Sequence, residues 1–114
     1  MYSVKVSKII EHFKLEPLTP NVEYDNRQVT ESDVNRPALQ LAGFFDYFDP
    51  TRLQIIGKVE HTYLQKMSQA DRAKCIERLM SYKEIPCIVL CREEINPFPE
   101  MIACAEKYGI PIFK

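Results

Sequence analysis

The pattern of apolar and polar positions is most regular in the last third of the chain. Residues 85–91 form a near-continuous apolar run, which is typical of a strand covered on both faces. Residues 96–109 then show helical spacing, with prolines at the start and Gly109 as a stop. The apolar face of this helix consists of Met101, Ile102, Ala105 and Tyr108. Residues 110–114 predict a further strand, so this third is a right-handed, parallel strand–helix–strand unit.

The first third of the chain has a weaker pattern. Residues 2–6 alternate as a short strand does, and Ser7 is placed to cap a following helix. The apolar positions of that helix are Val6, Ile9, Ile10 and Phe13. Pro17 ends the helical zone, because a proline inside a helix loses a hydrogen bond and clashes with the preceding turn. The remainder predicts short strands around a loop, the later one near 28–31.

The middle of the chain predicts a short helix, a strand and a further helical segment. Residues 36–43 indicate the short helix, with Pro37 at its first position and Gly43 at its end. Residues 51–59 are rich in apolar and β-branched side chains, as a strand is. Residues 60–67 follow as one or two helical turns.

The clearest helix begins at Ser68, with Asp71 three residues later in the manner of a capping box. Its apolar stripe consists of Ala73, Ile76, Leu79 and Met80. Together these elements predict one α/β domain over residues 1–114, with a small central, mostly parallel sheet flanked by helices. A chain of 114 residues is long enough to bury a core of its own.

Composition narrows the classes of function. The chain is 46% hydrophobic and 27% charged, with a net charge of −1, which is ordinary for a globular domain. Because no basic stripe stands out, nucleic-acid binding is not expected. No apolar run reaches the ~20 residues that span a bilayer, and the N terminus lacks the pattern of a signal peptide. We therefore expect a cytoplasmic protein that does not bind membranes.

The cysteines raise the question of a disulfide or a metal site. They are Cys75, Cys87, Cys91 and Cys104. Strand geometry puts the Cα atoms of Cys87 and Cys91 about 13 Å apart, whereas a disulfide needs less than ~7 Å. No C-x-x-C pair occurs, and His12 and His61 lie far from the cysteines in sequence. We expect buried, reduced thiols and no metal site, with a metal or redox role as the alternative.

The chain contains no complete catalytic motif. The sequence Gly-Lys-Val resembles part of a phosphate-binding loop, but Val59 and Arg52 stand where that motif needs Ser or Thr and glycine. The neighbours Glu60 and His61 can do acid–base chemistry, although a surface histidine is the plainer interpretation. Residues 92–94 follow a predicted strand at the edge where α/β proteins bind ligands, but we prefer a solvated charged loop. No catalytic residue is assigned.

The turn at residues 33–37 is a candidate ligand site. Arg36 stands just before a predicted helix, where its planar fork and the helix N-terminus suit a phosphate or carboxylate. Asp33 and Asn35 complete the candidate set. The alternative is a purely structural turn, held by a local ion pair between Asp33 and Arg36.

An aromatic segment follows this turn. It contains Phe44, Phe45, Tyr47 and Phe48. These are too many rings for one short segment to bury, so at least one is expected at a surface shared with another domain or subunit. Leu39 and Leu41, with some of the rings, are expected in the core.

Several motifs together resemble a known family. They are the turn D-x-N-R-P (33–37), the run L-x-L-A-G-F-F-D-Y-F (39–48), the strand R-L-Q-I-I-G-K-x-E (52–60), and the strand P-x-I-V (86–89) that leads to Y-G-I-P (108–111). On these motifs the chain resembles the N-terminal domain of bacterial HPr kinase/phosphorylase over essentially its whole length.

The resemblance implies a two-domain, homohexameric, cytoplasmic enzyme. Such enzymes use ATP or pyrophosphate with magnesium to phosphorylate a serine of HPr, a phosphocarrier of the sugar phosphotransferase system, and they also remove that phosphate. Their output is carbon catabolite repression. The phosphate loop, the magnesium ligands and the acid–base residue belong to a C-terminal P-loop kinase domain that this chain does not contain. The resemblance thus implies a regulatory or architectural domain without a cofactor, inactive alone, whose partner is the kinase domain of the same chain.

The resemblance also implies an alternative function. The family's N-terminal domain is similar in fold to that of Mur ligases, which holds a uridine nucleotide, although Ala38 stands where the Mur pattern has glycine. The alternative is therefore a sensor of a phosphorylated metabolite or nucleotide that uses the Asp33–Arg36 turn. The chain stops on a predicted strand without a tail, which we interpret as one domain of a longer protein.

Overall fold

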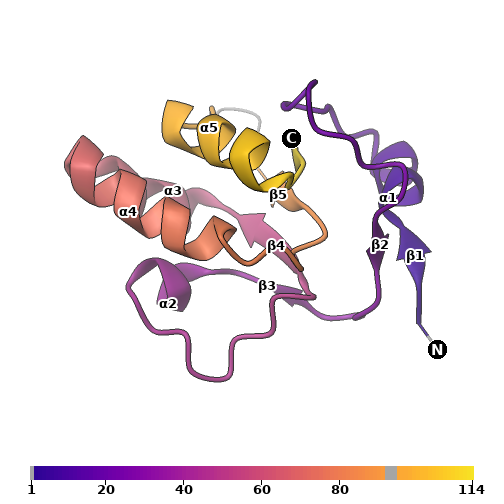
Figure 1. Cartoon of the computed structure of the whole chain (residues 1–114), viewed down its shortest axis with the longest axis horizontal. Helices are drawn as coiled ribbons and strands as arrows, with labels where there is room; N and C mark the ends of the chain where they lie inside the picture. The colour runs from indigo at the N-terminus through magenta and orange to yellow at the C-terminus, as the bar shows by residue number, and fades with distance from the viewer. Residues whose placement is uncertain (1, 92–94) are drawn as a thin grey trace.

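A parallel sheet, as the sequence predicts, forms the centre of the computed structural model, which describes residues 2–91 and 95–114 (Figure 1). Across these residues the sheet has four strands in the order β3-β4-β5-β6, and each neighbouring pair is parallel. The α/β class with a parallel sheet flanked by helices is thereby confirmed. The strands are β3 (Val34–Asn35), β4 (Leu53–Ile56), β5 (Ile88–Leu90) and β6 (Ile112–Phe113).

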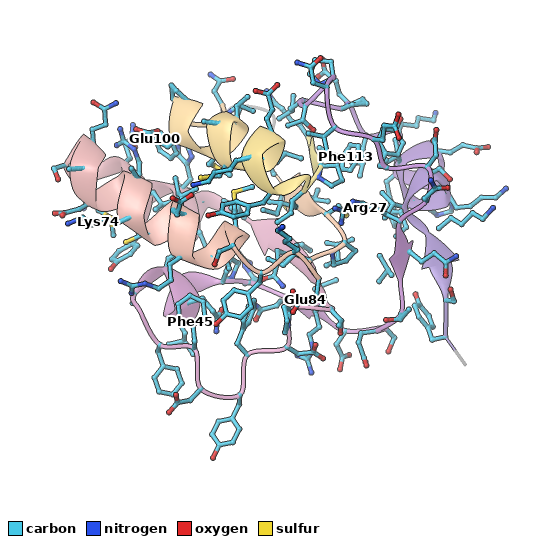
Figure 2. All side chains as sticks on the ribbon, viewed as in Figure 1. Arg27, Phe45, Lys74, Glu84, Glu100 and Phe113 are labelled. Atoms are coloured by element: carbon cyan, nitrogen blue, oxygen red, sulfur yellow. The ribbon has the colours of Figure 1, made fainter. Side chains whose placement is uncertain are left out.

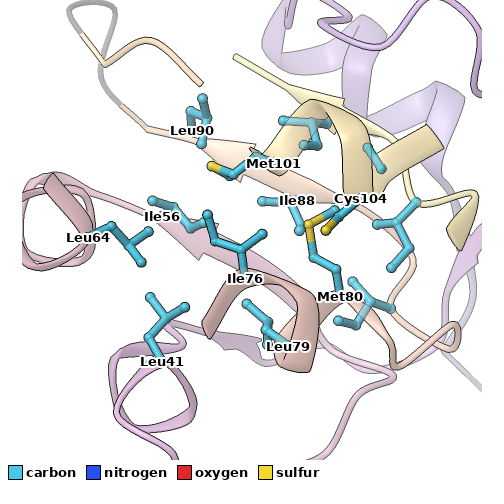
Figure 3. Packing of buried hydrophobic residues seen from close by; sticks show 14 of the residues in the cluster. Leu41, Ile56, Leu64, Ile76, Leu79, Met80, Ile88, Leu90, Met101 and Cys104 are labelled. Carbon is cyan, nitrogen blue, oxygen red and sulfur yellow. The ribbon is translucent and has the colours of Figure 1, made fainter. Parts of the chain in front are cut away.

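One face of the sheet is covered by the helices that connect its strands. Connections between parallel strands are right-handed. Because these strands are neighbours in the order in which they occur along the chain, such connections place every connecting helix on the same side of the sheet. Ile56, Leu79 and Ile88 are almost completely buried in the large core on this face (Figure 3). The helices are α2 (Ala38–Leu41), α3 (Lys58–Gln65), α4 (Gln69–Met80) and α5 (Pro99–Tyr108). Within the described residues, no helix combines the length and the apolar character needed to cross a bilayer.

The opposite face is covered by the first thirty residues (Figure 1), which also contact α5, where Asn21 Nδ2 donates a hydrogen bond of 2.9 Å to Glu106 Oε2. They form α1 (Val6–Phe13) and an antiparallel pair of strands, β1 (Val4–Lys5) and β2 (Gln28–Val29). Residues 16–18 also pair antiparallel with β6, where Glu16 and Lys114 exchange two backbone hydrogen bonds of 2.9 Å. A smaller core on this face consists of Val6, Val29, Leu53, Cys87 and Phe113.

Two helices have the boundary signals that the sequence predicts. At the start of α4, Ser68 Oγ accepts a hydrogen bond of 3.2 Å from the Asp71 N–H. Pro99 is the first residue of α5, where its missing N–H has no partner to lose. Gly109 ends α5 with a φ of 71°, a left-handed conformation that costs glycine little because it has no Cβ.

Two other boundaries differ from the prediction. Helix α1 begins one residue before Ser7, so Ser7 lies inside the helix and does not cap it. The predicted strand 51–59 is shorter, because Glu60 Oε1 accepts a hydrogen bond of 2.7 Å from the Gly57 N–H and starts α3 there. One continuous helix therefore replaces the end of that strand and the helical turns expected after it.

Candidate functional site

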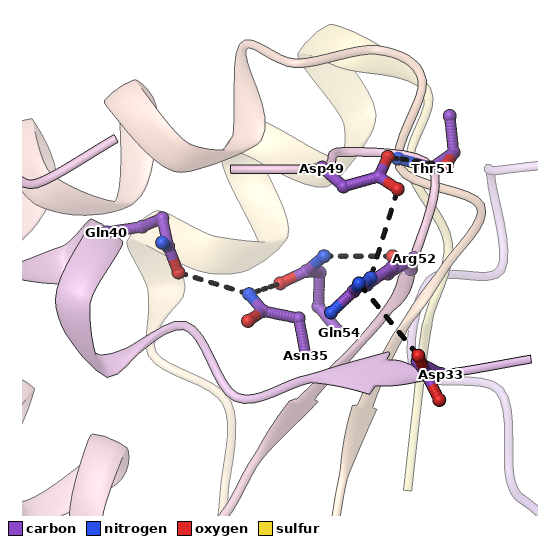
Figure 4. A network of polar contacts seen from close by, with 7 residues as sticks. All are labelled: Asp33, Asn35, Gln40, Asp49, Thr51, Arg52 and Gln54. Atoms are coloured by element: carbon purple, nitrogen blue, oxygen red, sulfur yellow. Dashed lines mark hydrogen bonds and ion pairs between the residues drawn. The ribbon is translucent and has the colours of Figure 1, made fainter. Parts of the chain in front are cut away.

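Asn35 is the centre of the predicted turn and has a structural role. Its Nδ2 group donates hydrogen bonds to Gln54 Oε1 at 2.6 Å and to Gln40 Oε1 at 3.1 Å (Figure 4). Gln54 Nε2 in turn donates to the Arg52 carbonyl at 2.8 Å. Because Gln40 and Gln54 are buried, the network provides partners for polar groups that water does not reach. It ties β3 to β4 and α2.

Asp33 and Arg36 have different partners, so the predicted ion pair between them is wrong. Arg36 Nη2 lies 3.1 Å from Glu60 Oε1, whereas Asp33 Oδ2 lies 3.9 Å from Arg52 Nη2. The two residues between them form β3, and three steps of extended chain separate Cα atoms by about 10 Å. The turn therefore does not bring its two charged side chains together.

Arg36 reaches the carboxyl edge of the parallel sheet, where it meets the start of α3. The Glu60 side chain is only 3% exposed, while that of Arg36 is 57% exposed. Glu60 also accepts from the Gly57 N–H, so its buried carboxylate has both a cation and a backbone donor. A Cβ at residue 57 would overlap the Arg36 guanidinium, so glycine lets the arginine cross to its partner. The Arg36–Glu60 pair therefore lies at the N-terminus of α3.

Asp49 organises the approach to β4. Asp49 Oδ1 accepts hydrogen bonds from Thr51 Oγ1 at 2.6 Å and from the Thr51 N–H at 3.0 Å. These two bonds, with the nearby Arg52 guanidinium, hold the pKa of Asp49 below its usual value. The carboxylate is thus kept charged next to a cation that also faces Asp33 (Figure 4).

The four aromatic residues divide into an inner and an outer pair. Phe45, labelled in Figure 2, stacks on Tyr82 with ring centroids 5.4 Å apart, and Phe48 meets Tyr82 edge-on at 5.2 Å. Phe44 is 48% exposed and Tyr47 is fully exposed. Tyr47 also has a φ of 63°, a left-handed conformation that is uncommon and costly for a bulky residue. Phe45 and Phe48 therefore anchor the segment on Tyr82, whereas Phe44 and Tyr47 are exposed to solvent.

We call residues 42–52, which join α2 to β4, the aromatic loop. Leu39 lies beside it, since its carbonyl accepts a hydrogen bond from the Phe44 N–H, and it is 62% exposed. The prediction that Leu39 fills the core is therefore wrong. Helix α2 is a single turn whose buried side is taken by Gln40 and Leu41, so Leu39 points outward. Leu39 extends the apolar surface of the outer pair.

Glu60 and His61 do not act as a pair, because adjacent residues of a helix face different directions. His61 stacks on Phe98 with ring centroids 4.7 Å apart. Partial burial in this stack lowers the pKa of His61. The Arg72 guanidinium carbon lies 4.5 Å from the centroid of the same Phe98 ring. Residues 92–94, the other charged candidate at this edge, lie outside the described residues.

The four cysteines are free thiols. Burial raises the pKa of Cys87 to about 12 and that of Cys104 to about 11, so both remain protonated near neutral pH. Cys91 is exposed at the end of β5, and desolvation raises its pKa too. In the part of the chain that the structure describes, no three His, Cys, Asp or Glu residues are grouped so that they could hold a metal ion.

The sequence contained signals for the structural roles of two residues, and these roles were not predicted. A glutamine at position 54, inside an otherwise apolar strand, needs a polar partner on the sheet, which is Asn35. Glu60 stands three residues after Gly57, at the spacing of a side chain that folds back on the start of a helix. Both signals were weak, because the partners that confirm them are identified only in the folded structure.

Comparison with known proteins gives a consistent result. The family model described as "HPr Serine kinase N terminus" matches residues 4–114. An HPr kinase/phosphorylase of Lachnoclostridium phytofermentans is 49% identical over 116 residues, which cover 100% of this chain and 36% of that protein. That of Caldicellulosiruptor bescii is 41% identical over 114 residues with the same coverage. That of Streptococcus uberis is 36% identical over 98% of the chain. The chain spans about 36% of the length of these relatives.

Proposed function

Because the chain belongs to the HPr serine kinase N-terminal family, we propose that it is the non-catalytic part of an enzyme that phosphorylates and dephosphorylates a serine of HPr. The relatives that carry the name HPr kinase/phosphorylase are nearly three times as long as the matched region, which supports a separate catalytic part. That part uses ATP or pyrophosphate with magnesium. The enzyme is a cytoplasmic homohexamer, and the 114-residue chain alone does not phosphorylate HPr.

The contribution of this chain is regulatory or architectural, through the aromatic loop. The observation that carries this proposal is the outer pair: Phe44 and Tyr47 are exposed on a loop that Phe45 and Phe48 anchor to Tyr82. A loop held from beneath loses little conformational freedom when it binds, so its exposed rings suit a contact with another domain or subunit. The left-handed Tyr47 backbone keeps that ring fully outward.

The ligand-sensing alternative is not favoured by any contact of the turn. Arg36 is engaged by Glu60 and Asp33 faces Arg52, so the two side chains do not converge on a common point. Asn35 is occupied by two buried glutamines. The turn positions the aromatic loop, because it shares the network through which Gln40 contacts the Phe44 carbonyl at 3.4 Å.

The test replaces the outer pair in the full-length protein. The double variant Phe44→Ala and Tyr47→Ala should shift the protein to smaller species in sedimentation velocity, because exposed anchor rings at an interface contribute about 1 kcal/mol or more each. Tyr63→Ala is the matched control, since Tyr63 is 43% exposed on α3, outside the loop. An unchanged sedimentation pattern in a double variant whose 1–114 region melts normally would reject the proposal.

A further inference from the structure

A cavity of about 860 Å³ lies between α1 and the sheet, on the face away from the connecting helices. We call it the α1 groove. Its floor is formed by the outward side chains of β4 and β5, Ile55 and Val89, and one wall by α1 and the turn that follows it. Its main apolar lining residues are Ile9, Phe13, Leu15, Val34, Ile55 and Val89. Such a volume is large enough for several side chains.

The groove exists because α1 covers this face only in part. Ile56 and Leu90, which point toward the helices, are 2% exposed, whereas Ile55 and Val89 beside them are only half-buried. Phe13 at the end of α1 is 65% exposed and Val34 on the edge strand is 49% exposed. These side chains form a connected apolar surface within one concave site, and such a surface marks a binding site on a soluble domain.

Lys114 lines the groove as well. Its position is held by the two hydrogen bonds with Glu16, so the polypeptide reaches the groove at a defined place. The relatives continue well beyond the region matched here, and the matched family describes the N terminus of such proteins. A segment that follows Lys114 therefore begins at the rim of the groove.

We propose that the α1 groove binds the segment that follows Lys114 in the full-length protein. The inference rests on one part of the proposed function, namely that the protein continues into a C-terminal part. A tethered segment is favoured over a second copy or a free ligand, because its short connection gives it a high effective concentration and a small closure cost. Its apolar side chains enter between α1 and the strands. Lys14, Glu16 and Lys114 also line the groove, so an acidic group in the segment is complementary to the two lysines.

Cys91 is a built-in reporter, because it is exposed and lines the groove. Its labelling by a bulky maleimide is followed by peptide mass spectrometry in the 114-residue chain and in the full-length protein, at pH 8. We expect labelling in the full-length protein to be slower by about tenfold or more, since a bound segment must first open. Equal rates overturn the proposal. Labelling of the 114-residue chain that becomes faster on dilution also overturns it, because a second copy then fills the groove.

A photo-crosslinker at Phe13 in the full-length protein identifies the occupant. With p-benzoylphenylalanine there, we expect crosslinks to peptides that follow Lys114 in the same chain. The same group at Lys74, exposed on α4, is the control. Crosslinks to another subunit only, or none, overturn the inference. This experiment does not depend on the aromatic loop. The Phe44 and Tyr47 variant can sediment unchanged while the Phe13 crosslink forms, and the crosslink can be absent while sedimentation changes.

Discussion

The two faces of the parallel sheet are covered in different ways. The face toward α2–α5 is covered by helices that the chain forms between successive strands, and its core side chains are almost completely buried. The face toward α1 is covered by a separate N-terminal layer, which leaves Ile55 and Val89 half-buried and a groove beside them. The helices that connect the parallel strands thus cover one face of the sheet as each strand is added. The second face is covered by a segment that is not part of these connections, and the coverage is partial.

The largest expected effect compares neighbours on one strand. Ile56→Ala should lower the free energy of unfolding by about 2–5 kcal/mol, because it leaves a cavity in the core under the helices. Ile55→Ala, the same change one residue earlier on the other face, should cost about 1–2 kcal/mol, since its side chain is already partly hydrated. Urea unfolding of the chain measures both. Equal costs would contradict the difference between the faces.

A second, smaller effect tests a side chain of the N-terminal layer that contacts the rest of the domain. Arg27, which precedes β2, donates to the Ile85 carbonyl at 2.9 Å and to the Gly109 carbonyl (Figure 2 labels Arg27). Arg27→Met should cost about 1–3 kcal/mol, because partly buried carbonyls lose their donor. Lys74→Met, at an exposed position of α4, should change stability by less than about 0.5 kcal/mol. If the two variants unfold alike, the Arg27 side chain is not needed to hold the N-terminal layer, and the apolar contacts and the Glu16–Lys114 pairing suffice.

The smallest effect concerns pH and the helix side of the molecule. Burial against Phe98 lowers the pKa of His61 in the folded state, so the folded protein favours the neutral ring. The unfolded chain then binds more protons as the pH falls below about 6.5, and stability should decrease there. His61→Gln should reduce this dependence between pH 7.5 and 5, as measured by thermal melting. The exposed His12, replaced by Gln, is the control; a slope unaltered by His61→Gln would refute the interpretation.

The sequence predicts the helix side better than the N-terminal side, for a physical reason. Helix α4, helix α5 and strand β5 are specified by local signals such as the Ser68 cap, the Gly109 stop and a continuous apolar run. The partner of Arg36 is Glu60, 24 residues away, and that of Arg27 is 58 or more residues away. No local pattern encodes contacts at such separations, so the Arg36–Glu60 pair, the contacts of Arg27 and the α1 groove were not predictable from the sequence.

The aromatic loop illustrates the same limit on a smaller scale. The abundance of rings predicts that some are exposed, but it does not say which. Tyr82, outside the segment, selects Phe45 and Phe48 for the inner pair. The single-turn α2 then directs Leu39 outward, against the prediction from its apolar character.

The pairing of Glu16 with Lys114 has a consequence for how the protein is made. During synthesis the residues of α1 are made before every strand of the parallel sheet, and β6, which pairs with the segment after α1, is made after β3, β4 and β5. The apolar contacts of the N-terminal layer with Leu53 and Cys87 are therefore available before β6 is made. The pairing of residues 16–18 is completed only when β6 has been released. This late, long-range pairing joins two segments that lie far apart in the sequence, so removing β6 would leave residues 16–18 without their strand partner.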